Sequence, residues 1–264
     1  MNTEFSHARD FIDDLAARGR YHFTSAEAKA ALGVSADAAK LALNRLRKQG
    51  RVAIPARGFY VIVPPEYRSI GCLPADQFIP QLMEKRSLSY YAGLLSAAQY
   101  YGAAHHRPQE FQVLVGTARR ALICGKVRVT FITRKRIGDV ATRPFNTPRG
   151  SIAVSTPEAT AIDLAGYPDH TGGLEQCATV LSELSGQLDP DRLVDAARTV
   201  PLPWAQRLGY LLSIGEAGDV TGPLRDFVRN KARGYVPLAL HGDRDGPRSR
   251  DWKLILNEAV EPEF

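Results

Sequence analysis

Residues 24–50 read TSAEAKAALGVSADAAKLALNRLRKQG and predict two helices separated by a tight turn. Thr24 and Glu27 have the spacing of a capping box, which favours a short helix that ends at Gly33. Ser35 then caps a longer helix that runs to the end of the stretch. The apolar residues expected on the buried face of this longer helix are Ala39, Ala42, Leu43 and Leu46.

The segments on either side complete the pattern. Before the stretch, apolar residues recur at helical spacing and predict a first helix that ends at Gly19. After it, residues 51–54 and 58–63 predict two β-strands around a Pro55-Ala56-Arg57 turn. Three helices, with a glycine in the turn between the second and third, followed by a basic hairpin are typical of a winged helix-turn-helix. The two prolines that follow end this unit, so we expect a first domain at residues 1–65.

The rest of the chain, residues 66–264, predicts a mixed α/β domain with a small sheet and several helices, so the fold class is α+β. Residues 66–80 are rich in turn residues and are expected to form a linker or a docking segment. The expected strands are 111–115, 126–133, 151–154 and, near the C-terminus, 252–257. The expected helices are 88–101, 156–165, 173–185, 190–199 and 203–215.

The composition favours a globular protein with an acidic partner. The hydrophobic fraction is 44%, the formal net charge is +6 and the pI is about 9.3, and nucleic acid is the first partner to consider for such a balance. No apolar run approaches the roughly 20 residues that span a bilayer, and no signal peptide is expected, so the expected location is the cytoplasm. The cysteines, Cys72, Cys124 and Cys177, are odd in number and far apart, which indicates buried reduced thiols.

The longer helix has a cationic face opposite its apolar one, and a helix that enters the major groove needs both. Asn44 suits an adenine edge, and Arg45 or Arg47 suits guanine or phosphate. Ser25 and Ser35 begin helices, where backbone amides bind phosphate. The residues expected at DNA are Ser25, Ser35, Lys40, Asn44, Arg45, Arg47, Lys48 and, on the wing, Arg51 and Arg57. The alternatives are a merely solvated basic helix and a winged helix that contacts only proteins.

A second basic patch follows the predicted strand at 111–115. Alternation along the next strand places Lys126, Arg128 and Thr130 on one face and apolar residues on the other. The members of the patch are Arg119, Arg120, Lys126, Arg128, Arg134, Lys135 and Arg136. Such a face extends a DNA footprint, binds RNA or meets an acidic protein, and the alternative is again a solvated sheet face.

The sequence offers no strong signal for catalysis, for a metal or for a cofactor. His105-His106 is a poor chelate, because adjacent side chains diverge in an extended chain and no further ligand stands at metal spacing. His241 lies near Asp243 and Asp245, but in a Gly/Pro-rich segment where solvation explains it. We therefore expect no enzyme, no metal site and no cofactor.

Two phrases, SYYAGLLSA at 89–97 and STPEATAIDL at 155–164, follow the predicted winged helix. With them the chain resembles the AbiEi family, the antitoxins of bacterial AbiE-type (type IV) toxin–antitoxin and abortive-infection systems. The small residues of the first phrase allow close helix packing, and the second begins with a helix cap. Asp163 lies in an apolar helix, where a buried hydrogen bond is the expected role. The chain departs from the family at Ala159-Thr160, where members often carry a basic residue.

The resemblance implies a bifunctional protein. The winged helix would repress its own operon by binding inverted repeats in double-stranded promoter DNA, with two copies of a monomer on one site. The other domain would oppose a cognate toxin that resembles a nucleotidyltransferase, directly or indirectly, and no membrane partner is implied. Two other classes stay open: a nuclease that a winged helix delivers to DNA, and a module that recruits a protein through the basic sheet face.

Overall fold

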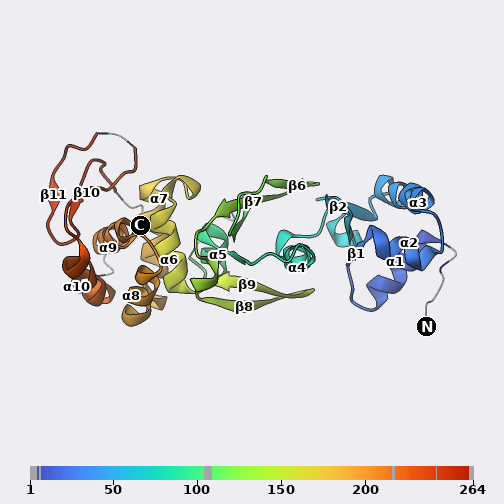
Figure 1. Ribbon diagram of the computed structural model, residues 1–264, viewed down its shortest axis with the longest axis horizontal. Coiled ribbons are helices and arrows are strands. Elements are labelled where there is room, and N and C mark those ends of the chain that lie inside the picture. The colour runs from blue at the N-terminus through green and yellow to red at the C-terminus, as the bar shows by residue number, and fades with distance from the viewer. Residues whose placement is uncertain (1–4, 6, 104–108, 216–217, 242, 262–264) are drawn as a thin grey trace. The chain divides into compact units, whose positions relative to one another are not determined.

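The computed structural model describes residues 5, 7–103, 109–215, 218–241 and 243–261 (Figure 1). The chain divides into two compact units. The first comprises residues 1–90, 109–133 and 144–153, and the second comprises residues 91–108, 134–143 and 154–264. The boundary predicted after residue 65 falls inside the first unit, so the predicted domain division stays a prediction.

The first unit begins with the predicted winged helix-turn-helix (Figure 1). Its elements are α1 (Ala8–Ala17), β1 (His22–Thr24), α2 (Ser25–Leu32), α3 (Ala36–Lys48), β2 (Val52–Ala56) and β3 (Phe59–Ile62). The sheet has the order β1-β3-β2 with antiparallel pairs. The sequence did not predict β1, because three residues are too few to show an alternating pattern.

Local signals set the helix ends as predicted. Thr24 Oγ1 accepts a hydrogen bond from the Glu27 amide at 3.2 Å, and Glu27 Oε2 accepts one from the Thr24 amide at 2.7 Å, which completes the capping box. Gly33 has a left-handed φ of 62°, which a glycine adopts without steric cost. Ser35 Oγ accepts from the Ala38 amide at 3.2 Å and caps α3.

Residues 66–80 are packed, as expected of a docking segment, and do not form a free linker. Cys72, Leu73 and Phe78 are fully buried in a core cluster that also contains Phe59 of the wing. The further elements of this unit are η1 (Pro65–Tyr67), η2 (Ala75–Gln77), α4 (Ile79–Lys85), β5 (Phe111–Val115), β6 (Leu122–Cys124) and β7 (Val127–Thr133). Strand β7 pairs in parallel with β5 and antiparallel with β6.

The predicted helix at 88–101 is wrong in its first half and right in its second. The chain instead forms β4 (Tyr90–Ala92) and then α5 (Leu94–Tyr100). Leu94 has a positive φ of 53°, and this left-handed conformation changes the direction of the backbone between the two elements. In the second unit Ala92 pairs in parallel with Val154 of β9 (Gly150–Ser155), the strand that follows β8 (Thr142–Thr147).

Most of the second unit is helical and surrounds one helix. All ten residues of α6 (Pro157–Gly166) are buried, and the helix contacts α5, α7, α8 and α9. The other elements of the second unit are η3 (Ile137–Asp139), η4 (Pro168–His170), α7 (Leu174–Leu184), η5 (Ser185–Gln187), α8 (Pro190–Arg198), α9 (Leu202–Ile214), η6 (Gly218–Thr221), α10 (Gly222–Lys231), β10 (Val236–Pro237), β11 (Arg248–Ser249) and β12 (Leu254–Ile255). The predicted terminal strand at 252–257 is thus only the two-residue β12.

Candidate nucleic-acid interface and buried polar network

Helix α3 presents its cations to solvent and its apolar face to the core, as the spacing predicted. Ala39, Leu43 and Leu46 are buried against the winged-helix core. On the other sides of the helix, Lys40, Arg45, Arg47 and Lys48 are exposed, and Asn44 is half-buried. Among the described residues none of these four cations has a carboxylate partner, so their charges are available to a ligand. Their contact with DNA stays a prediction.

Two of the predicted DNA contacts are already engaged inside the winged helix. Arg51 is only partly exposed, and its Nη2 donates to Asp13 of α1 at 2.6 Å. The Ser25 amide donates to the Gly58 carbonyl at 3.3 Å, so this amide is not available to a phosphate. Arg57 is exposed at the turn between β2 and β3, and Ser35 is exposed at the start of α3. The exposed candidates therefore come from α3 and from the wing turn.

The second basic patch is divided between the two units. In the first unit Arg119, Arg120, Lys126 and Arg128 are exposed, and the alternation predicted for β7 is confirmed by the burial of Val129 and Phe131. Arg86 also belongs here, because partial burial and the like charge of Arg119 lower its pKa. No pattern in the sequence indicated Arg86, which lies at the end of α4, far from the patch along the chain. In the second unit Lys135 and Arg136 are exposed.

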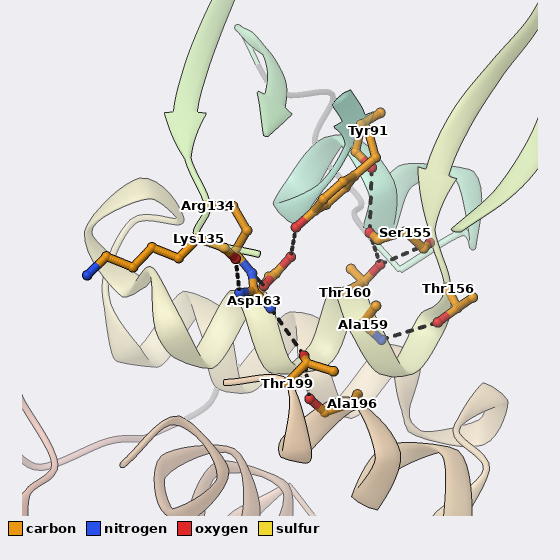
Figure 2. Close-up of polar contacts among 11 residues, drawn as sticks. Tyr91, Arg134, Lys135, Ser155, Thr156, Ala159, Thr160, Asp163, Ala196 and Thr199 are labelled. Atoms are coloured by element: carbon orange, nitrogen blue, oxygen red, sulfur yellow. Dashed lines mark hydrogen bonds and ion pairs between the residues drawn. The ribbon is translucent and has the colours of Figure 1, made fainter. Parts of the chain in front are cut away.

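Arg134 was expected in that exposed patch, but it is buried. Its Nε donates to Asp163 Oδ1 at 3.0 Å, and its guanidinium lies 5.3 Å from the Trp204 ring centroid. Nη1 donates to the Lys135 carbonyl at 2.8 Å, and Nη2 approaches Thr199 Oγ1 at 3.4 Å. Figure 2 shows Arg134 and Tyr91 converging on Asp163. The residue therefore stabilises the second unit and is not available to a partner.

Asp163 is the centre of this network. It is fully buried, and the Tyr91 hydroxyl donates to its Oδ2 at 2.6 Å. The expected buried hydrogen bond is therefore confirmed, together with a guanidinium partner that the sequence did not reveal. Burial raises the pKa of Asp163 to about 6, against the opposing effects of Arg134 and the Tyr91 hydrogen bond. Burial, and then the charge of Asp163, raise the pKa of Tyr91, so its hydroxyl remains a donor.

The first residues of the segment 155–164 also have a structural role. Thr156 Oγ1 accepts from the Ala159 amide at 3.3 Å and caps α6. Ser155 Oγ and Thr160 Oγ1 lie 2.7 Å apart in a buried hydrogen bond (Figure 2). Ala159 and Thr160, where the sequence was expected to depart from the family, are both buried here. Within this segment Ser155 and Thr160 therefore satisfy each other, whereas Asp163 depends on Arg134 and Tyr91.

Asp163 makes the stability of the second unit depend on pH. Because its pKa is about 6 in the folded chain and ordinarily 3.8, the folded state binds more protons than the unfolded state between these values. Stability from this group is therefore full below pH 3.8 and is lost as the pH rises through 6. We expect the difference in free energy of unfolding between wild type and Asp163→Asn to shrink by roughly 2–3 kcal/mol from pH 4 to pH 7, in urea titrations at each pH. A constant difference would contradict this assignment.

A cavity of about 420 Å³ in the second unit is lined by residues of α6, α8 and the segment 134–141. Its charged lining residues are Arg134, Asp139, Glu158, Arg192 and Asp195. Asp163 is the ion-pair partner of Arg134 and Arg198 that of Asp195, so the carboxylates of Asp139 and Glu158 remain against the one guanidinium of Arg192. The net negative charge of the lining disfavours an anionic ligand.

The described residues carry no arrangement typical of a metal site. No group of three His, Cys, Asp or Glu residues there is arranged to hold a metal ion. His241 lies 3.4 Å from Asp169, and both are exposed, whereas His105-His106 lies outside the described residues. The three cysteines are free and buried, as predicted. Among the described helices none is both long and apolar enough to cross a membrane.

Comparisons with known proteins give matches to two family models and a likeness to solved structures. Residues 91–214 match the AbiEi antitoxin C-terminal domain, and residues 10–63 match the AbiEi antitoxin transcriptional regulator. The crystal structure of the RV2827C protein from Mycobacterium tuberculosis is similar with a TM-score of 0.67 and 18% identity, over 95% of this chain and 91% of that one. At this identity the likeness shows the fold alone. No curated protein matches the chain.

Proposed function

The chain belongs to the AbiEi antitoxin family, and from that premise we propose that it represses its own operon and opposes a cognate nucleotidyltransferase-like toxin. The antitoxin and regulator roles are those of the family. That the promoter is the chain's own and that the toxin resembles a nucleotidyltransferase is our proposal. The observation that carries it is α3, whose exposed cations have no acidic partner among the described residues and lie on a correctly folded winged helix.

In the proposed complex α3 lies in the major groove and the wing turn lies against the backbone. Asn44 and Arg45 would read base edges, because amide and guanidinium groups make bidentate hydrogen bonds there. Arg57, at the turn between β2 and β3, would bind phosphate. One winged helix per chain implies two copies on an inverted repeat.

The proposed base contacts are tested by binding to the DNA upstream of the gene. We expect Asn44→Ala and Arg45→Ala each to reduce discrimination against a scrambled fragment by about 1–3 kcal/mol. Arg57→Ala should weaken binding to both fragments equally and lower the salt dependence by about one phosphate contact. Fluorescence anisotropy at several stated salt concentrations measures all three.

Arg198→Ala is the matched control, because this arginine is 64% exposed on α8 of the second unit. It should bind both fragments as wild type does. Equal affinity of the wild-type protein for the upstream and scrambled fragments would refute specific repression, since phosphate contacts alone do not discriminate.

The antitoxin part is tested separately in cells that express the neighbouring gene. A full-length chain with Asn44→Ala and Arg45→Ala should lose repression of an upstream reporter and still restore growth. Rescue that fails together with repression would show that neutralisation requires DNA binding. Incubating the chain with plasmid DNA and Mg²⁺ tests the nuclease alternative, which requires cleavage that is lost with an acidic residue.

A further inference from the structure

One large apolar side chain lies on the outer face of α3. Leu41 is 61% exposed, whereas the apolar residues Leu43 and Leu46 of the same helix are buried. Among the described residues, four large hydrophobic side chains are more than a third exposed: Val34, Leu41, Ile123 and Leu240. Isolated exposed leucines are common on protein surfaces, so the exposure matters here only because of its position.

The position of Leu41 is the middle of the surface that faces away from the core. At 100° per residue around the helix axis, Leu41 lies about 160° from the buried Leu43 and about 160° from the buried Ala39, and it therefore points outward. Asp37 lies one turn before it, and Arg45 and Lys48 follow it on the same side, all of them exposed. A leucine thus stands at the centre of a row of charged residues. No described residue of the winged-helix core covers it.

The major groove contains one apolar group that such a side chain matches. Guanine, cytosine and adenine present only hydrogen-bonding groups there, and thymine adds its C5-methyl group. A leucine that enters the groove loses its contact with water without gaining a hydrogen bond, so it favours a methyl group over a polar edge. The charged neighbours hold the helix near the phosphates while Leu41 faces the bases.

We infer that Leu41 is a specificity-determining residue that reads a thymine by packing against its C5-methyl group in each half-site. The inference rests on the proposed function, because it requires that α3 enter the major groove. It assigns the apolar contact to Leu41 and leaves the hydrogen-bonded contacts to Asn44 and Arg45. The operator should therefore contain a thymine near the centre of each half-site.

The test replaces every thymine of the upstream fragment with uracil, by amplification with dUTP in place of dTTP. This change removes the methyl group and keeps O4. Burial of one methyl group corresponds to about a fourfold change in affinity, so two protomers should bind the uracil fragment about 15-fold more weakly. Leu41→Ala should bind the thymine fragment more weakly than wild type and should not distinguish the two fragments. Single thymine-to-uracil changes then locate the position that is read.

Leu240→Ala is the matched control, because Leu240 is 53% exposed and belongs to the second unit. It should respond to uracil as wild type does. If wild type and Leu41→Ala lose the same factor on the uracil fragment, or if Leu41→Ala binds as tightly as wild type, the inference is wrong although specific repression stands. If wild type does not prefer the upstream fragment to a scrambled one, the proposed function itself fails. A change from dimer to monomer in Leu41→Ala without DNA would instead assign Leu41 to a contact between copies.

Discussion

Arg134→Met is expected to lower the free energy of unfolding of the second unit by about 3–5 kcal/mol. The substitution retains an apolar stem and removes the guanidinium, so that the fully buried Asp163 keeps its hydrogen bond from the Tyr91 hydroxyl but loses its counter-ion. A buried carboxylate without its counter-ion has lost most of the interaction that compensates its desolvation. Urea unfolding followed by tryptophan fluorescence measures the effect, because both tryptophans, Trp204 and Trp252, belong to this unit.

The double variant Arg134→Met/Asp163→Leu is the informative control. Replacing both partners of a buried ion pair by apolar residues is often neutral, so most of the lost stability should return. Adding Tyr91→Phe should return more, since the tyrosine hydroxyl would otherwise be buried without an acceptor. Arg198→Met, at an ion pair with both side chains more than 60% exposed, should change stability by less than about 1 kcal/mol. A double variant as unstable as Arg134→Met would show that packing, and not charge, is the cause.

The winged helix was predictable because its signals are local. The capping box at Thr24 and Glu27, the left-handed Gly33 and the helical spacing in α3 each act within a few residues. The failure at 88–101 has the opposite cause. One hydrogen-bonded partner of β4 lies more than sixty residues away, as in the pairing of Ala92 with Val154, and no local pattern reveals such a partner.

The same distinction explains which candidate site residues were placed correctly. The exposure of Arg45 and Lys48 follows from the period of their helix, so the sequence predicted it. Arg51 and Arg134 are the same residue type, but their partners Asp13 and Asp163 are 38 and 29 residues away. The sequence does not reveal which distant carboxylate an arginine will contact, and both arginines were therefore assigned to exposed basic surfaces. Leu41 was missed for a different reason: it lies outside the predicted apolar face of the helix, and only polar residues were considered as contacts to DNA.

Arg207→Met is expected to lower the free energy of unfolding of the second unit by about 2–6 kcal/mol. Arg207 is the largest fully buried side chain among the described residues, at 1% exposure. Its Nε donates to the Leu238 carbonyl and its Nη1 to the Ala165 carbonyl, both at 2.7 Å. Ala165 is in the last turn of α6, where carbonyls lack partners within the helix. Methionine would leave two buried acceptors unsatisfied.

The position of Leu238 makes a second result expected. Arg207 connects α9 to the segment that follows α10, so its loss should release residues 233–257 before the rest of the unit unfolds. Limited proteolysis should cut Arg207→Met in this segment under conditions in which wild type resists. Arg229→Ala is the matched control, because Arg229 also binds the segment, through Asp251 at 2.5 Å, but both side chains are more than half exposed. If Arg229→Ala releases the segment and Arg207→Met does not, the surface ion pair holds it and the buried guanidinium does not.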